Sequence, residues 1–118
     1  MLPDKLMDIP TCKDLVQCAF SLNDFEVTVY SKLVELGPSR ADEAAESMDR
    51  DRSTVYRSLQ KLMSCSIVYR ESRSIDRGGY YHVYTPISKS MMKEKLRRCV
   101  EEWHENMLNM LSRFEEDF

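Results

Sequence analysis

Residues 39–65 read SRADEAAESMDRDRSTVYRSLQKLMSC, and this stretch decides the fold expected for the chain. One helix is predicted over residues 41–48. A second is predicted over 54–65, where Ser53 is a strong N-cap residue. The polar tract 49–52 between them predicts a tight turn. Two helices joined by so short a turn form a helix-turn-helix arrangement.

The two predicted helices differ in their faces. Ser39 is expected to open the first helix, where the small residues Ala44 and Ala45 allow another helix to cross closely. In the second helix, apolar residues at helical spacing predict a stripe that faces the core: Val55, Leu59, Leu62 and Met63. The other side chains of this helix are expected to remain in solvent: Thr54, Arg57, Ser58 and Lys61.

Two further helices are expected before this pair. A short one covers residues 11–20. A longer one covers 24–36, where Asn23 and Glu26 form a capping-box pattern and the Gly-Pro pair that follows ends the helix.

After residue 65 the apolar period changes from 3.6 to 2. Strands are predicted over residues 67–73 and 80–85, and the loop 74–79 between them contains two glycines that can adopt positive φ. Pro86 ends this hairpin, and a final helix is expected over 89–116.

The predicted fold class is therefore mainly α with a small antiparallel β-hairpin. We expect an N-terminal helical extension (1–20), a winged helix-turn-helix domain (21–87) and a long C-terminal dimerisation helix (88–118).

The basic side chains are concentrated in one part of the sequence. The chain has a formal net charge of −3, yet residues 52–85 carry six basic and two acidic side chains. A phosphate backbone responds to local charge, so an acidic chain of this kind can still bind nucleic acid at one site. The alternative is that these arginines form an ordinary solvated face.

The order of elements suits double-stranded DNA, because one helix fits the major groove and the hairpin can reach the backbone or the minor groove. Ser53 and the free N–H groups at the helix start are also expected to bind a phosphate. The residues predicted to contact DNA are Arg40, Arg52, Ser53, Thr54, Tyr56, Arg57, Ser58, Lys61, Arg70, Arg73, Arg77 and Gly78.

The final helix carries an apolar stripe that approximates a heptad seam and predicts a homodimer. The alternative is that this helix folds back onto the helix over 11–20. A hydrophobic effector slot between methionine-rich helices is a further alternative. The residues predicted at the dimer interface are Leu15, Met92, Leu96, Cys99, Val100, Trp103, Met107, Met110, Leu111 and Phe114.

The stretch from Phe20 to Ile87 resembles the archaeal TrmB-like winged-helix regulators, which are close to the MarR-type fold. The resemblance is carried by LNDFEVTVYSKLVELGPSRADEAAESMDRDRSTVYRSLQKL, SIVYRESR and GGYYHVYTPIS. The resemblance implies a dimer that binds promoter DNA through the recognition helix (53–65) and the wing, which is the hairpin segment 70–80.

Two features depart from the family pattern. Residues 64–66 are Ser-Cys-Ser where such families commonly place a glycine, so a less tightly held helix exit is expected. Larger members carry a C-terminal sugar-binding domain, whereas one helix follows residue 87 here, so no maltose-like effector is expected.

Other functional classes find little support in the sequence. The four cysteines have no Cys-x-x-Cys or zinc-ligand spacing, which predicts free thiols in a reducing cytoplasm, with redox sensing as the alternative. No P-loop or dinucleotide motif, long apolar run or secretory signal is found, so no cofactor, metal, enzyme activity or membrane partner is expected. A winged helix that binds proteins of the transcription machinery is the alternative function.

Overall fold

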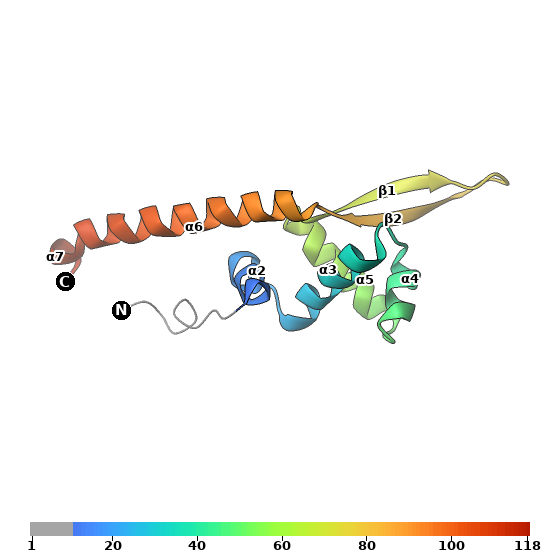
Figure 1. The fold of residues 1–118 in the computed structure, drawn as a ribbon, viewed down its shortest axis with the longest axis horizontal. Coiled ribbons are helices and arrows are strands. Elements are labelled where there is room, and N and C mark those ends of the chain that lie inside the picture. Colours follow the sequence, from blue (N-terminus) through green and yellow to red (C-terminus); the bar gives the residue numbers. More distant parts are fainter. Residues whose placement is uncertain (1–10) are drawn as a thin grey trace. The chain divides into compact units, whose positions relative to one another are not determined.

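The computed structural model describes residues 11–118 and divides the chain into two compact units, which end at Ser88 and begin at Lys89. The predicted mainly helical fold with one antiparallel hairpin is confirmed (Figure 1). The part of the predicted extension over residues 1–10 lies outside the described residues. The elements of the first unit are α2 (Cys12–Phe20), α3 (Asp24–Leu36), α4 (Ala41–Ser47), α5 (Arg52–Ser64), β1 (Val68–Ser74) and β2 (Tyr80–Pro86).

Helix α3 begins and ends as its sequence predicts. Asn23 accepts a hydrogen bond from the Glu26 N–H (2.7 Å), and the Glu26 carboxylate accepts one from the Asn23 N–H (2.8 Å). These bonds complete the capping box. Gly37 closes the helix at φ 81°, with its N–H donating to the Leu33 carbonyl.

The core of the first unit lies where α3, α4 and α5 pack together. Val29 and Leu33 of α3 are fully buried, as are the predicted core residues Val55, Leu59 and Leu62 of α5. Both alanines of α4 that were predicted to permit a close helix crossing are also buried. The small size of these alanine side chains lets the backbones of α4 and α5 approach each other.

The hairpin has a shape that the sequence only partly predicts. Strand β1 begins at Val68 and pairs with β2 in antiparallel register. At the tip, Gly78 and Gly79 adopt φ of 95° and 86°, as predicted. Ser39 forms an isolated bridge to Tyr84: its N–H donates to the Tyr84 carbonyl (3.1 Å), and the Tyr84 N–H donates back (2.7 Å). The base of the wing is therefore fastened to the segment before α4, and Ser39 does not cap that helix.

The exit of α5 is closed by hydrogen bonds although it lacks the family glycine. Ser66 adopts the left-handed conformation, with φ 60°. Its N–H donates to the Met63 carbonyl (2.9 Å), and the Ile67 N–H donates to the Leu62 carbonyl (3.2 Å). This is a Schellman motif, and Ile67 and Leu62 are both fully buried beside it. The expectation of a less tightly held exit was wrong, because buried apolar side chains hold the turn.

The second unit contains α6 (Lys89–Ser112) and α7 (Phe114–Asp117). The predicted single helix over 89–116 is therefore interrupted, at Arg113, which has φ −107° and ψ 8°. Its N–H bonds to the Met110 carbonyl, three residues back, so the last turn of α6 tightens before α7 starts.

Replacing Ser66 with glycine is expected to stabilise the protein by about 1 kcal/mol, because a residue with a Cβ is strained at positive φ and glycine is not. Urea unfolding followed by circular dichroism measures the change. Ser66→Ala is the matched control and retains the strain. A Ser66→Gly variant no more stable than Ser66→Ala would contradict this account.

Tyr30 generates a prediction at alkaline pH. Its buried hydroxyl donates to the Ile87 carbonyl (3.1 Å), and burial raises the pKa of Tyr30 above its usual value of 10.0. The contribution of the protonated Tyr30 hydroxyl to the free energy of unfolding is therefore fully present below pH 10. It is lost as pH rises through the pKa of Tyr30 in the folded state. Tyr30→Phe should cost about 1 kcal/mol at pH 7. The free-energy difference from wild type should shrink above pH 10, and a pH-independent difference would refute this role.

Candidate nucleic-acid interface

Helix α5 has one face in the core and one in solvent. Ser58 lies on the core face and is only 6% exposed, so the prediction that it stays in solvent was wrong. Its spacing explains the burial, because Ser58 stands three residues after Val55 and four before Leu62. Ser58 is therefore not available to contact a base.

The solvent face of α5 presents polar side chains in helical register. Ser53, Arg57, Gln60 and Ser64 are all exposed and follow one another at spacings of four, three and four residues. Gln60 was not among the predicted contacts, although its spacing from Arg57 could have identified it. Arginine and glutamine are the side chains that form paired hydrogen bonds with guanine and adenine, respectively.

The start of α5 is capped by a carboxylate. Asp51 is the N-cap residue, and its side chain accepts hydrogen bonds from the Thr54 N–H (3.0 Å) and hydroxyl (2.6 Å). These bonds lower the pKa of Asp51, so it is ionised at neutral pH. The prediction of Ser53 as N-cap was wrong, because the helix begins at Arg52. The Thr54 N–H is occupied and is not free for a phosphate.

Within residues 11–118, the basic side chains of α5 and the hairpin have no acidic partner. Every ion pair formed among residues 11–118 lies elsewhere, on α2, α3, α4 or α6. Unpaired cations at a surface attract phosphate more strongly than paired ones. The six side chains concerned are Arg52, Arg57, Lys61, Arg70, Arg73 and Arg77.

The hairpin distributes its arginines over more than one surface. Arg70 pairs with Tyr84 and Arg73 with Tyr81 in the antiparallel register. Since successive side chains of a strand alternate, Arg70 and Arg73 point to opposite faces. Arg77 lies in the exposed turn beside Gly78, whose N–H donates to the Ile75 carbonyl.

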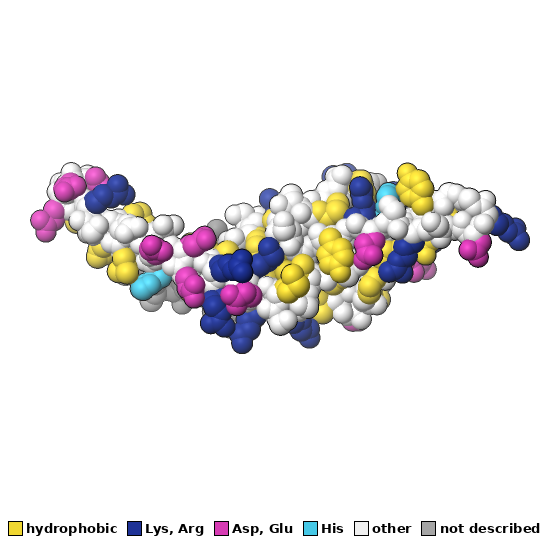
Figure 2. Space-filling model, turned by 90° about the horizontal axis from the view of Figure 1, so that it is seen from above, with side chains coloured by type: hydrophobic (Ala, Val, Ile, Leu, Met, Phe, Trp, Pro, Cys, Tyr) yellow, Lys and Arg dark blue, Asp and Glu magenta, His cyan; other side chains and the backbone are white. Residues whose placement is uncertain are grey.

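The space-filling view agrees with this dispersed arrangement. In Figure 2, Lys and Arg side chains occur over the hairpin and its tip, interspersed with hydrophobic and acidic ones. On the face that Figure 2 shows, the basic side chains of the hairpin are therefore separated by other side chains and do not form one continuous patch.

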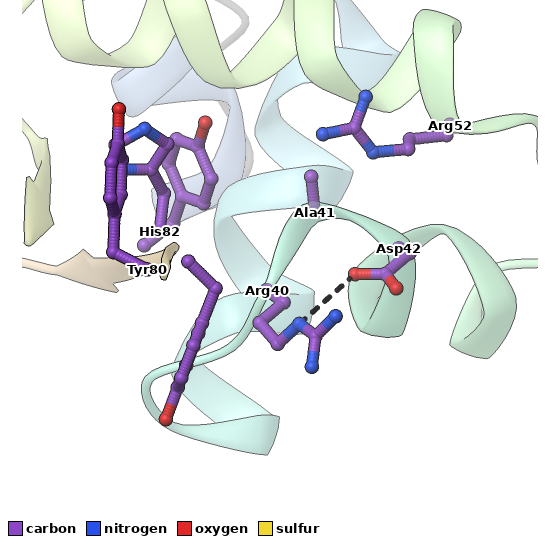
Figure 3. Close-up of a pocket in the computed structure, with 8 residues that line it drawn as sticks. Arg40, Ala41, Asp42, Arg52, Tyr80 and His82 are labelled. Atoms are coloured by element: carbon purple, nitrogen blue, oxygen red, sulfur yellow. Dashed lines mark ion pairs between the residues drawn. The ribbon is translucent and has the colours of Figure 1, made fainter. Parts of the chain in front are cut away.

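Arg40 and Arg52 both line an open pocket of about 420 Å³ (Figure 3). The pocket lies between the starts of α4 and α5 and strand β2. The Arg40 guanidinium lies 5.1 Å from the ring centre of Tyr81, and its Nε lies 3.5 Å from an Asp42 carboxylate oxygen. Arg52 lies 5.7 Å from the ring centre of Tyr56. Stacking on an aromatic ring restricts a guanidinium while leaving its edge free to donate.

The predicted dimer residues differ in exposure. Val100, Met110, Leu111 and Phe114 are between 45% and 67% exposed. Met92, in the first turn of α6, is only 6% exposed. Phe114 lies beyond the interruption at Arg113 and stacks on Phe118 at 4.8 Å. The partly buried members of the stripe are Leu96, Cys99, Trp103 and Met107.

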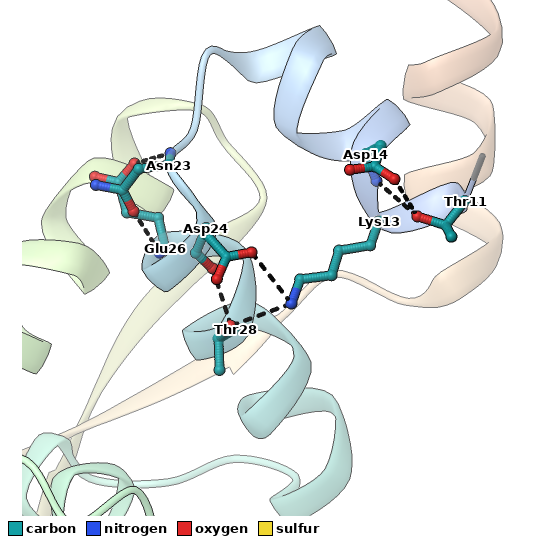
Figure 4. Close-up of polar contacts among 7 residues, drawn as sticks. All are labelled: Thr11, Lys13, Asp14, Asn23, Asp24, Glu26 and Thr28. Carbon is teal, nitrogen blue, oxygen red and sulfur yellow. Dashed lines mark hydrogen bonds and ion pairs between the residues drawn. The ribbon is translucent and has the colours of Figure 1, made fainter. Parts of the chain in front are cut away.

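Leu15 lies on α2, which is anchored to α3 within the first unit. The Lys13 ammonium contacts the Asp24 carboxylate (3.5 Å) and the Thr28 hydroxyl (3.4 Å), as Figure 4 shows. Val16, next to Leu15, is buried. Helix α2 is thus part of the compact first unit, and Leu15 itself is half-buried there.

Residues 11–118 also bear on other kinds of site. Over 11–118, no cluster of three or more His, Cys, Asp or Glu side chains could hold a metal ion. All four cysteines are free thiols. No helix in the described part of the chain is long and apolar enough to cross a membrane.

Helix α3, the α4–α5 pair, the Ser39 bridge and the β1–β2 hairpin together define a winged helix-turn-helix protein. Residues 16–90 match the family model described as sugar-specific transcriptional regulator TrmB. The chain belongs to this family of transcriptional regulators, as its sequence resemblance predicts.

Two archaeal relatives match most of the chain. Uncharacterized protein MJ1503 of Methanocaldococcus jannaschii is 37% identical over 105 residues, which cover 89% of this chain and 80% of that protein. Uncharacterized protein MJ1082 of the same organism is 31% identical over 107 residues, which cover 91% of this chain and 88% of that protein.

Solved structures share the fold. A possible transcriptional regulator from Methanosarcina mazei superposes with a TM-score of 0.78 at 27% identity, covering 87% of this chain and 88% of that one. A MarR-like transcriptional regulator from Thermotoga maritima superposes with a TM-score of 0.52 at 21% identity, covering 96% and 85%. The second likeness concerns the fold alone.

Proposed function

We propose that this protein is a sequence-specific regulator of transcription that binds double-stranded DNA as a homodimer. The observation that carries the proposal is the set of six basic side chains on α5 and the hairpin that have no acidic partner within residues 11–118. Membership of a transcriptional regulator family supports it independently. In such a protein, unpaired cations supply affinity for phosphate, and exposed side chains of one helix read bases.

In this proposal α5 enters the major groove with its exposed face toward the bases. Arg57 and Gln60 are the side chains best suited to read sequence, since each can form two hydrogen bonds with one base. Ser53 and Thr54 lie at the N-terminal end of the same helix, which is the end that meets bases in helix-turn-helix proteins. Lys61, further along, contacts the backbone.

The wing contacts the DNA backbone or the minor groove beside the site of α5. Arg77 is exposed at its tip, where the two glycines form a narrow turn without side chains. Because Arg70 and Arg73 point to opposite faces, we assign only one of them to the DNA side in any one orientation.

The homodimer in this proposal forms through α6. Val100, Met110 and Leu111 are large apolar side chains with at least 45% of their surface exposed. A second copy of the same helix offers a matching stripe, and a two-fold axis would set two α5 helices about 34 Å apart, one turn of DNA.

Arg57→Ala is expected to weaken binding to a preferred site by about 1–3 kcal/mol and to reduce the preference for that sequence over others.

Arg77→Ala should weaken binding to all sequences and reduce the salt slope by about 1 for each phosphate that is no longer neutralised. Fluorescence anisotropy with duplex DNA from the region upstream of the protein's own coding sequence, at several salt concentrations, measures both.

Arg98→Ala is the matched control, because Arg98 is an exposed arginine of α6 outside the proposed surface. If all three variants bind duplex DNA as wild type does, the assignments to Arg57 and Arg77 are wrong. If wild type binds no duplex even at low salt, the DNA-binding proposal fails, and capture of protein partners is the next experiment.

Met110→Glu is expected to weaken the dimer at least tenfold, because it places a charge in an apolar seam. Sedimentation equilibrium at micromolar concentrations measures the association. Asn109→Glu adds the same charge to the neighbouring exposed position, which lies about 100° around the helix, and should leave the dimer intact. A wild-type protein that is monomeric under these conditions would exclude the dimer.

A further inference from the structure

We infer that the pocket between α4, α5 and β2 is a phosphate site, separate from the base-reading face of α5 and from the tip of the wing. The pocket brings together side chains from three parts of the first unit: Arg40 before α4, Arg52 at the start of α5, and Tyr80, Tyr81, His82 and Tyr84 on β2. If the ligand is a phosphodiester of DNA, the inference rests on the proposed function. If the ligand is a free phosphate, the inference is independent of that function.

The two sides of the pocket have different chemistry. In Figure 3 the guanidinium groups of Arg40 and Arg52 lie on one side, with Ala41 between them, and Tyr80 and His82 lie across from them. Guanidinium groups offer a planar set of N–H donors that suits phosphate oxygens. Tyrosine rings offer a flat apolar surface and a hydroxyl that can donate to a phosphate oxygen.

The arginine side is held in place before any ligand arrives. Arg40 stacks on Tyr81 at 5.1 Å, and its Nε faces Asp42 at 3.5 Å, so four N–H donors on its two terminal nitrogens remain. Asp42 offsets part of the positive charge, but it does so at the Nε side of the guanidinium. Arg52 stacks on Tyr56 and has no ion-pair partner within residues 11–118.

The size and openness of the pocket favour a phosphate ester over a bare ion. A volume of about 420 Å³ exceeds that of a single phosphate group and accommodates a phosphate with its sugar. Arg52 lines the pocket and is followed by the exposed Ser53, so in the proposed complex a DNA backbone at the N-terminal end of α5 would lie next to this pocket. A free phosphate ester in the same place would compete with that backbone.

The test for a DNA source uses duplexes in which single phosphates are replaced by neutral methylphosphonates. Wild type should lose about tenfold in affinity at one backbone position beside the α5 site. Arg40→Gln and Arg52→Gln should each bind the unmodified duplex more weakly and no longer respond at that position. Arg98→Gln, the matched loss of one exposed charge, should retain the wild-type profile. Circular dichroism confirms that each variant is folded.

The test for a free source follows the side-chain N–H signals of Arg40 and Arg52 by NMR, during titration with inorganic phosphate and then deoxycytidine monophosphate at constant ionic strength. Saturable shifts of both signals, with the shift of the remaining arginine lost in Arg40→Gln and in Arg52→Gln, support a phosphate site even if wild type binds no duplex, in which case only the proposed function fails. Two results together would overturn the inference. The first is that Arg40→Gln and Arg52→Gln respond to methylphosphonates as Arg98→Gln does. The second is that phosphate shifts neither arginine signal.

Discussion

The hydrogen bonds that close the turn between α4 and α5 fix the orientation of α5 against the rest of the first unit. Asp49 adopts φ 54°, its N–H donates to the Glu46 carbonyl (3.2 Å), and the Arg50 N–H donates to the Ala45 carbonyl (3.0 Å). Two residues later the Asp51 carboxylate caps the next helix. One helix is thus closed and the other opened within three residues, and no free segment remains in which their crossing could vary. The orientation of the exposed face of α5 follows directly.

The same turn places a negative charge where a DNA-binding helix would be expected to avoid one. Asp51 is exposed, and its hydrogen bonds with Thr54 lower the pKa of its carboxyl, so it carries a negative charge at neutral pH. A serine at this position could cap the helix without a charge. In the complex proposed above, an acidic cap at the edge of a basic surface lowers attraction to phosphate in general and does not touch the base contacts that we propose for Arg57 and Gln60. Such a balance favours selectivity over affinity.

Sequence patterns predicted the features that depend on local spacing, and they failed where a contact between distant segments decides. The apolar stripe of α5, the capping box at Asn23 and the glycine turn of the wing are local, and all were predictable. The Ser39–Tyr84 bridge joins residues 45 positions apart and leaves no periodic signal. The polar side chain of Ser58 predicts exposure to solvent, whereas its spacing from Val55 puts it on the buried face of α5. The pocket formed by Arg40, Arg52 and β2 exists only once three elements have packed together.

The outer part of the wing has a thermodynamic consequence. Residues 69–80 are all exposed, so beyond its base the hairpin is held by its own ladder of hydrogen bonds and by no core. A two-stranded ribbon of this kind is only marginally ordered in water. Fixing it against a groove therefore removes conformational entropy at the moment of association. In the proposed complex, ordering of the wing would therefore add an unfavourable entropy that grows with temperature, whereas the proposed base contacts come from a helix that the core already holds.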